Sequence, residues 1–421
     1  MAAYQSLAKL FHADVSTSRF SANQAEARVR LSSASTFRTG IFLERPGQDA
    51  VELFLATPCE LSVINEQVLR VERKVSRLWN SLPGLGRWAY LRHLILDEIV
   101  STNEIEGIHS SRRQISEAID IVRRQEPSSR RERFVELARL YLELTDRRQK
   151  RPCTPEDLRA VYDRVVADEV AQEDSPDGAL FRKSAVDIWD SHQRLRHTGV
   201  FPESKITSMV SQMIELAERS DIPAVYSALL AHFVFEYIHP FYDGNGRTGR
   251  YLLALYLSEP LSVTTSLSLS RVIAENKNAY YKAFDTVEDP LNHGEATMFV
   301  LTLMGLIRQA QDSAIEQLEM KNGQLAHVDR QLRAIEGQVG LSSKAAELLF
   351  LMAQYALFDD FGEIALADAA EYLGASTQTA SKYLHELAEK SLTLQVGARP
   401  LKYTLSDQLR RALGIDPIVI D

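Results

Sequence analysis

The sequence has few cysteines and no excess of positive charge. Its 421 residues include two cysteines, Cys59 and Cys153, and no Cys-x-x-Cys pair. This scarcity argues against a disulfide framework and a structural zinc site, and it fits a reducing compartment. The net charge of −9 argues against a general nucleic-acid coat, although a small basic patch could still bind DNA locally.

Long apolar runs are also missing. No segment reaches the roughly 18–20 uninterrupted apolar residues of a membrane span. The stretch from Met1 to Phe20 contains polar residues throughout and has no apolar region followed by a cleavage site, so we expect no signal peptide. We therefore expect a soluble, cytoplasmic protein with no membrane contact.

The composition is that of a globular protein, with 45% hydrophobic and 25% charged residues. Its length suggests two to three domains. Periodicity predicts a mainly α-helical chain, with helices near 62–80, 88–105, 110–124 and 298–333 and a hairpin or irregular arm at 36–55. The expected regions are an N-terminal arm (1–60), a helical region (61–130), a core (131–310), a linker helix (311–338) and a C-terminal domain (339–421).

Residues 239–250 concentrate polar groups in one loop, His-Pro-Phe-Tyr-Asp-Gly-Asn-Gly-Arg-Thr-Gly-Arg, between two apolar helices. Pro240 disfavours helical backbone at His239. Gly244 and Gly246 allow a close backbone approach to a ligand. A glycine-rich loop that opens a helix directs free N–H groups and the positive end of the helix dipole at one point, so we predict an anion site suited to phosphate.

Charged side chains complete this site. Arg247 and Arg250 lie three residues apart, on neighbouring positions of the first helical turns, where they can reach two successive phosphates. Asp243 offers a hard oxygen ligand for Mg²⁺, which binds through one or two carboxylates and phosphate oxygens. His239 can accept a proton from a hydroxyl that attacks phosphorus. No Gly-Lys-Ser/Thr follows, so the loop is not a P-loop.

The loop resembles the signature of the Fic (filamentation induced by cAMP) family, His-x-Phe-x-Asp/Glu-Gly-Asn-Gly-Arg-x-x-Arg, at every fixed position. The resemblance covers about residues 60–310 and implies a Fic-type helical bundle with a β-hairpin flap. It also implies Mg²⁺-dependent transfer of AMP from ATP to a Ser, Thr or Tyr hydroxyl of a target protein, and of the chain itself. Doc kinases carry Lys at the position of Gly246, which argues against the kinase variant. Relatives that transfer phosphocholine or UMP leave the donor open.

The resemblance also assigns roles to residues. His239 would be the catalytic base and Asp243 the Mg²⁺ ligand. The positions implied to bind the nucleotide are Gly244, Asn245, Gly246, Arg247, Thr248, Gly249, Arg250, Tyr280 and Tyr281. Phe181-Arg182 and residues 184–191 resemble the flap, which aligns a target segment by strand addition, with Ile188 and Trp189 as docking positions.

A second segment matches the same family. Thr102 and Glu106 are four residues apart and share one face of a helix at about 88–107. Beside a Fic core, residues 101–107 resemble the inhibitory motif Ser/Thr-x-x-x-Glu-Gly/Asn. The resemblance implies that Glu106 pairs with Arg250, so that the γ-phosphate loses its clamp and ATP binds unproductively. The same carboxylate could orient a water molecule for removal of AMP, as in some relatives.

The C-terminal residues follow a helix, helix, helix, hairpin pattern and resemble the winged-helix domains of many bacterial Fic proteins. Residues 376–384 open a helix with small polar residues, as DNA-reading helices do, and Arg399, Lys402 and Tyr403 could contact phosphates. Several acidic residues keep the region from being strongly basic, so DNA binding, protein binding and dimerisation all remain possible roles. Because family members often dimerise, we expect a homodimer.

Competing functions follow from these features. The first is an adenylyltransferase that Glu106 inhibits. The second is a winged-helix DNA-binding regulator whose Fic core senses a nucleotide. A bifunctional enzyme that both adds and removes AMP is a further alternative.

Overall fold

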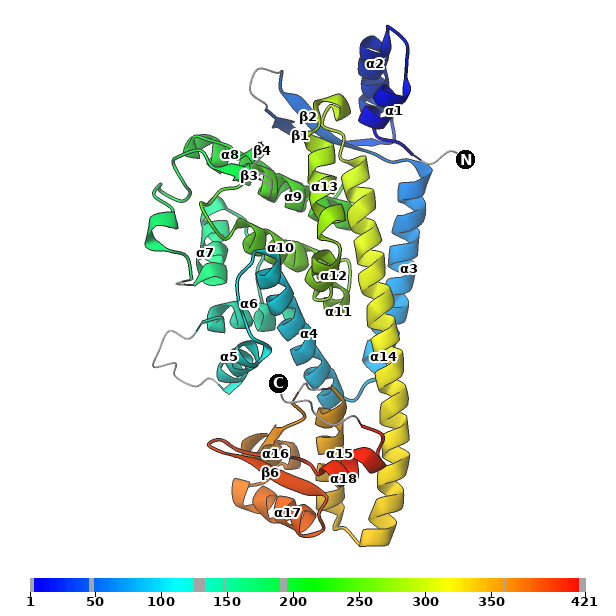
Figure 1. The fold of residues 1–421 in the computed structure, drawn as a ribbon, viewed down its shortest axis with the longest axis vertical. Helices are drawn as coiled ribbons and strands as arrows, with labels where there is room; N and C mark the ends of the chain where they lie inside the picture. Colours follow the sequence, from blue (N-terminus) through cyan, green and yellow to red (C-terminus); the bar gives the residue numbers. More distant parts are fainter. Residues whose placement is uncertain are drawn as a thin grey trace. The chain divides into compact units, whose positions relative to one another are not determined.

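A computed structural model describes residues 4–44, 49–124, 133–146, 148–167, 169–189, 195–358 and 361–415. This described part of the chain is mainly α-helical, as predicted, with small antiparallel sheets (Figure 1). It divides into two compact units, and each is treated by itself below. The first unit comprises Met1–Arg73 and Ile95–Asp312, and the second comprises Lys74–Leu94 and Ser313–Asp421.

The first unit begins with an arm of two helices and a hairpin. Its elements are α1 (Leu7–Ala13), α2 (Arg19–Ser32), β1 (Thr36–Leu43) and β2 (Val51–Ala56). The hairpin agrees with the prediction for residues 36–55, whereas the sequence pattern does not predict the two helices. Long-range contacts hold α2 in place, because the buried amide of Asn23 donates to the carbonyls of Leu7 and Leu291.

A helical core follows the arm. In chain order its elements are α3 (Cys59–Ser81), α4 (Gly84–Ile105), α5 (Arg112–Arg124), α6 (Val135–Thr145), α7 (Pro155–Val166), η1 (Gln172–Asp174), β3 (Asp187–Trp189), β4 (Leu195–Thr198), α8 (Glu203–Ala217), α9 (Ala224–Ile238), α10 (Asn245–Leu257), α11 (Val263–Ser266), α12 (Leu269–Glu275), α13 (Lys277–Glu288), η2 (Pro290–Asn292) and α14 (Thr297–Val339). Helices α3, α4 and α14 continue from one unit into the other. Among the described helices, none combines the length and the apolarity that crossing a membrane requires.

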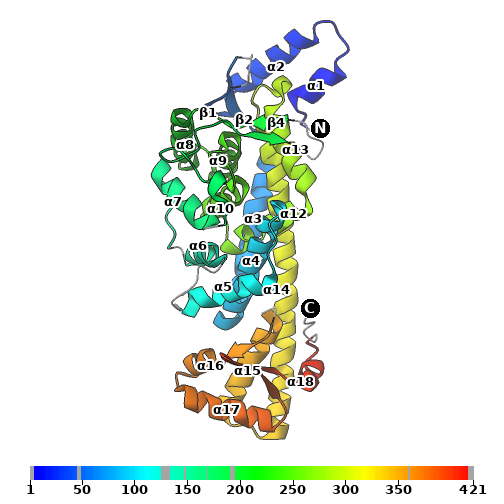
Figure 2. The ribbon, with the colours of Figure 1, turned by 60° about the vertical axis from the view of Figure 1, so that its left-hand side comes forward.

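Helices α9 and α10 form the centre of this core, with α7 and α8 packed against them (Figures 1 and 2). Nearly every residue of both helices is buried, which explains why α9 and the part of α10 after Arg250 are apolar on almost every side. Their interior position holds the connecting loop, residues 239–244, between two rigid supports.

The second unit contains the ends of α3 and α4 around residues 81–84, the later part of α14, and a small C-terminal module. The elements of this module are α15 (Ser343–Phe358), β5 (Ile364–Ala365), α16 (Leu366–Leu373), α17 (Thr377–Glu389), β6 (Thr393–Ala398), β7 (Leu401–Leu405) and α18 (Asp407–Ala412). Its sheet has the strand order β5-β7-β6 and is antiparallel. The expected three helices and hairpin are present, together with β5 and α18; the winged-helix assignment stays a prediction.

The compact units divide the chain differently from the regions expected at 61–130 and 311–338. The segment Lys74–Leu94 belongs with the chain beyond Ser313. In this unit the Tyr90 hydroxyl donates to the Gln317 side chain at 3.0 Å, and Gly86 lies against the ring of Phe358. A segment-by-segment interpretation misses this pairing because the partners are more than two hundred residues apart in the chain.

Candidate functional site

The polar loop has the backbone that its proline and glycines predict. Helix α9 ends at Ile238, and His239 adopts a left-handed conformation with φ of 50°. Gly244 is also left-handed, with φ of 80°, and α10 begins at the next residue. A side chain at Gly244 would meet Val166 of α7, so both the turn and the packing require glycine there.

Several residues predicted to contact a nucleotide form hydrogen bonds within the loop. The Asn245 side chain accepts from the backbone N–H of Phe241 at 3.0 Å and donates to the Phe241 carbonyl at 2.8 Å. The Thr248 hydroxyl donates to the Gly244 carbonyl at 2.9 Å. Both side chains are buried, and their polar atoms are used internally. Asn245 therefore shapes the loop, and its contact with a nucleotide stays a prediction.

Aromatic side chains pack around Phe241 of the same loop. The ring of Phe241 lies 3.5 Å from that of Tyr162 and 5.6 Å from that of Phe181, measured between centroids. Phe241 is completely buried. The fixed phenylalanine of the loop is thus a core residue that ties residues 239–244 to α7 and to the segment before β3.

His239 is held in its neutral form. Burial lowers the pKa of His239 to about 3, and the nearby His197 and Arg182 lower it further in the same direction. Among the described residues no hydrogen-bond partner meets its buried Nδ1 atom. A neutral imidazole can accept a proton at physiological pH, which is the property that a general base needs.

Arg250 contacts Thr102 of α4 and Glu106 in the turn that follows α4. Its Nη2 atom lies 2.7 Å from Oε1 of Glu106, and its Nε donates to the Thr102 hydroxyl at 2.8 Å. The Arg250 side chain is 2% exposed, whereas that of Glu106 is 32% exposed. Burial alone would lower the pKa of Arg250, but Glu106 and other nearby groups raise it overall, so the guanidinium stays charged. Thr102, Glu106 and Arg250 are thus brought together as predicted.

The Glu106 carboxylate also lies at the N-terminal turn of α10. A Cβ atom added at Gly246 would overlap this carboxylate and would approach Nη1 of Arg250. The N-terminus of a helix attracts anions through its free N–H groups and its dipole. Glu106 therefore places a negative charge where the sequence predicts a phosphate.

Arg247, which is predicted to clamp a phosphate, pairs with a buried carboxylate in this structure. Its Nη1 atom pairs with Oε2 of Glu169 at 2.7 Å, and the two side chains are only 1% and 5% exposed. Burial raises the pKa of Glu169, although Arg247 opposes that shift. Sequence analysis does not identify Glu169, because a single acidic residue after α7 resembles any exposed loop residue.

Asp243 is exposed at the start of the loop, and its Oδ1 accepts the Gly244 backbone N–H at 2.6 Å. No group of three or more His, Cys, Asp or Glu residues suited to a metal occurs among the described residues. One exposed carboxylate beside a phosphate site fits Mg²⁺, which takes few protein ligands and completes its shell with phosphate oxygens and water.

The two predicted pocket tyrosines differ from each other. Tyr280 is buried, and its hydroxyl lies 2.8 Å from Nε2 of His232, whose Nδ1 lies 3.1 Å from the Gly249 carbonyl. Burial lowers the pKa of His232 to about 3, so the neutral ring donates from Nδ1 and accepts from Tyr280. Tyr281 is 48% exposed and remains available to a ligand. His232 is a further residue that the sequence does not reveal, because it lies within an apolar helix.

The expected hairpin at the flap is present. Ile188 of β3 pairs with His197 of β4, and Trp189 pairs with Leu195. Trp189 is largely exposed, and the predicted stretch at 190–194 lies outside the described residues. Strand β4 is attached to α13 and α9, since His197 contacts Glu288 and the Tyr237 carbonyl, each at 2.7 Å.

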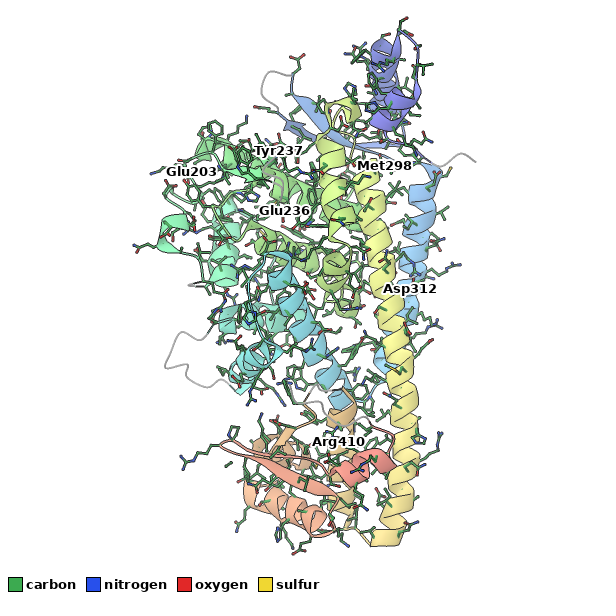
Figure 3. The ribbon with its side chains drawn as sticks, viewed as in Figure 1. Glu203, Glu236, Tyr237, Met298, Asp312 and Arg410 are labelled. Carbon is green, nitrogen blue, oxygen red and sulfur yellow. The ribbon has the colours of Figure 1, made fainter. Side chains whose placement is uncertain are left out.

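Gly178 and Glu203 shape the turn that precedes the flap. The backbone N–H of Gly178 donates to the Phe181 carbonyl at 2.9 Å, and the Glu203 carboxylate accepts from the N–H groups of Leu180 and Phe181. A side chain at Gly178 would overlap Glu203. Glu203 is at the start of α8, and Figure 3 labels it on the same side of the core as Tyr237 and Glu236 of α9.

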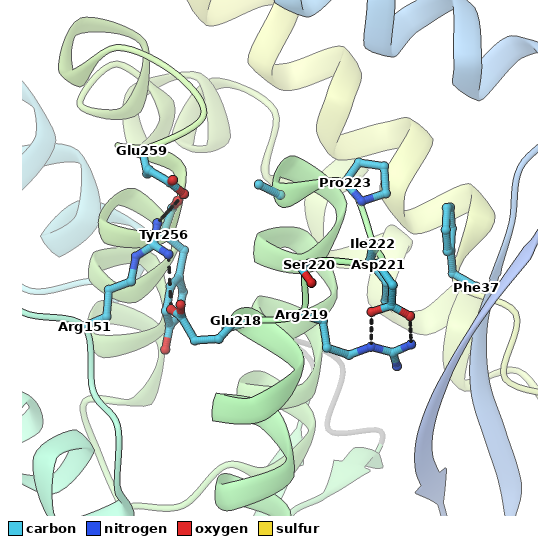
Figure 4. A pocket seen from close by; sticks show the side chains of 12 residues that line it. Phe37, Arg151, Glu218, Arg219, Ser220, Asp221, Ile222, Pro223, Tyr256 and Glu259 are labelled. Carbon is cyan, nitrogen blue, oxygen red and sulfur yellow. Dashed lines mark hydrogen bonds and ion pairs between the residues drawn. The ribbon is translucent and has the colours of Figure 1, made fainter.

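A cavity of about 590 Å³ lies at the opposite end of α9 from His239 (Figure 4). It is lined by Phe37, Arg151, Tyr256, Glu259 and residues 217–224. Its two arginines already have carboxylate partners, since Arg151 pairs with Glu218 and Glu259, and Arg219 pairs with Asp221. None of the predicted site residues lines it.

The fold and site define a mainly helical protein in which a buried helix–loop–helix carries a neutral histidine, an exposed carboxylate and a glycine-rich helix N-terminus. Residues 152–257 match the model of the Fic/DOC family.

Three solved structures are also similar to this chain. A Fic family protein from Desulfovibrio desulfuricans G20 is 18% identical, with 84% of this chain and 97% of that chain covered and a TM-score of 0.48. A Fic domain containing signaling protein from Bacteroides thetaiotaomicron VPI-5482 is 16% identical, with coverages of 59% and 97% and a TM-score of 0.40. Fic-1 from C. elegans is 19% identical, with coverages of 62% and 74% and a TM-score of 0.41.

Proposed function

We propose that this chain transfers AMP from ATP to a hydroxyl side chain of a protein and that Glu106 holds this activity back. The observation that carries the proposal is the Glu106 carboxylate, which pairs with Arg250 at the anion site of α10. A negative side chain held at this point competes with the terminal phosphate of a nucleotide for the same N–H groups and the same guanidinium.

The chemistry follows from the neutral His239. The target hydroxyl oxygen attacks the α-phosphorus of ATP, and its proton passes to the imidazole of His239. The new phosphorus–oxygen bond replaces the bond to the bridging oxygen, and pyrophosphate leaves. Asp243 would hold Mg²⁺, which when bound neutralises charge on the phosphates. The exposed Tyr281 is available to contact the nucleotide base or sugar.

Intact mass measurement tests the proposal. We expect the Glu106→Gly variant, incubated with ATP and Mg²⁺, to gain an AMP-sized adduct on itself or on added protein, and the Glu106→Gly, His239→Ala variant to gain none. Parallel reactions with UTP and CDP-choline identify the donor. Absence of any adduct, together with tight binding of a DNA fragment, would favour the DNA-binding regulator instead.

A further inference from the structure

Arg182 is a fully buried arginine that contacts carbonyl oxygens. Its Nε donates to the His239 carbonyl at 2.8 Å, its Nη1 to the Ser184 carbonyl at 2.5 Å and its Nη2 to the Ile238 carbonyl at 3.2 Å. Its backbone N–H donates to the Pro240 carbonyl at 3.2 Å. One residue thus contacts three consecutive carbonyls at the point where α9 becomes the loop.

These carbonyls need such a partner. The last carbonyls of a helix lack intrahelical donors and carry the negative end of the helix dipole, so a cation is stabilising there. His239 follows in a left-handed conformation that a non-glycine residue adopts only when its surroundings hold it. The planar guanidinium can satisfy several carbonyls at once, which the single ammonium of lysine cannot do in the same geometry.

The same guanidinium contacts the flap. The Ser184 carbonyl lies just before β3, and after β4 the backbone N–H of Val200 donates to the Ile238 carbonyl at 3.0 Å. A Cβ atom at Gly199 would overlap Nη2 of Arg182 and would approach Cβ of His239. Both ends of the flap hairpin therefore meet at the Arg182 guanidinium and the backbone of the base.

We propose that Arg182 is a positioning residue that fixes the backbone of His239 and couples the position of the flap hairpin to that of the base. This inference rests on the proposed function. A target segment that pairs with the flap would then act on His239 through the Ser184 and Ile238 carbonyls. Arg182 itself touches neither nucleotide nor target.

Electrostatics agree with this placement. The charged or titratable groups that face His239 are Arg182, from the segment before β3, and His197, from β4; after burial, these two groups lower the pKa of His239. Removal of the Arg182 charge should therefore raise the pKa of His239. The imidazole would then take up a proton at higher pH than in the parent protein.

The test compares variants in the Glu106→Gly background. We expect Arg182→Lys to lower kcat by about 10- to 100-fold, since small misplacements of a reacting group cost this much, with little change in the KM for ATP. Gly199→Ala, which displaces Arg182 without removing its charge, should lower kcat in the same direction. Arg159→Lys is the matched control, because Arg159 donates to the neighbouring Leu180 carbonyl at 2.7 Å without touching the loop.

Nitrogen-15 NMR of the histidine rings provides a readout that does not depend on transfer activity. In the otherwise unchanged protein, Arg182→Gln should raise the pKa of His239, whereas Arg159→Gln should not. If Arg182→Lys folds and its kcat is unchanged, the inference is overturned. If the arginine variants do not fold, an unchanged kcat in Gly199→Ala overturns it. If Glu106→Gly shows no transfer at all, the proposed function fails, and an unchanged His239 titration in Arg182→Gln would then overturn the inference separately.

Discussion

The two ends of residues 239–250 are held by opposite kinds of contact. At the His239 end, the Arg182 cation donates to neutral carbonyls of the loop itself. At the Arg250 end, the cation belongs to α10, and its partner Glu106 is a partly exposed carboxylate in the turn that follows α4. The first set of contacts is built into the backbone, whereas the second can be exchanged for another anion.

Under the proposed function, this difference separates the positioning of His239 from the inhibition by Glu106. The carbonyls that Arg182 contacts belong to the backbone beside His239, so these contacts hold His239 in place. Glu106 competes with any phosphate for Arg250, because both are anions that suit the same guanidinium and helix terminus. Arg247 and Glu169, between these ends, form a third arrangement, in which an ion pair is buried on both sides and shielded from exchange.

Loss of the base should have the largest effect. We expect His239→Ala in the Glu106→Gly background to lower the transfer rate by about 10²- to 10⁴-fold, the usual contribution of a general base. Nucleotide binding should persist, since Arg250 and the N-terminus of α10 remain. Time courses of adduct mass and calorimetric titration with ATP measure the two quantities. A rate within tenfold of the parent's would show that another group accepts the proton.

Disruption of the buried Arg247 pair should affect stability rather than inhibition. Glu169→Gln leaves a buried guanidinium without its counter-charge, which typically costs about 3–5 kcal/mol. The free energy of unfolding from urea titration measures this loss. Asp312→Asn is the control, since it breaks the more exposed Arg308–Asp312 pair and should cost no more than about 1 kcal/mol. If Glu169→Gln activated transfer, the Arg247–Glu169 pair would have the inhibitory role that we propose for Glu106.

Weakening the exchangeable contact should produce partial activation. Thr102→Val removes the hydroxyl that accepts from Nε of Arg250 and should raise transfer about 3- to 10-fold, in line with the net contribution of one typical hydrogen bond, about 1 kcal/mol. Thr102→Ser keeps the hydroxyl and should behave like the parent protein. Rates of AMP incorporation decide between them. Equal rates for the two variants would exclude a role for this hydroxyl in restraining Arg250.

The smallest expected effect concerns Glu236, which lies one turn before His239. Burial raises the pKa of Glu236 from 4.5 to about 8, although Arg250 opposes the shift. When a carboxyl binds its proton more tightly in the folded state, the protein loses stability as the pH rises from the unfolded pKa of that group to its folded pKa. The loss is at most about 1.4 kcal/mol per pH unit. His232 and His239 are neutral in the folded state and mostly neutral in the unfolded state above pH 7, so they contribute little there.

We therefore expect the free energy of unfolding to fall between pH 7 and pH 8 and Glu236→Gln to reduce this slope. Glu98, whose pKa burial raises to about 7, acts in the same direction and should preserve part of the slope. Urea unfolding at the two pH values gives the comparison. A slope as steep in Glu236→Gln as in the parent would show that Glu236 is not the titrating group.

The sequence by itself determines the local chemistry of this protein. Proline and glycine set the backbone from His239 to Gly244, helix periodicity places Thr102 and Glu106 on one face, and Thr154 caps α7 together with Asp157. These features depend on spacing within a few residues, and such spacing is visible in a sequence. The resemblance of the loop to a known family extends this local knowledge to a site.

Only the tertiary structure decides which groups are partners and which polar atoms remain available. Arg182 is 57 residues from the carbonyl of His239, and Glu169 is 78 residues from Arg247. The number of residues between two such groups does not tell how far apart they lie, because the tertiary fold sets that distance. Asn245 occupies a fixed position of the family signature and Thr248 a variable one, yet packing directs the polar atoms of both towards the backbone of the loop.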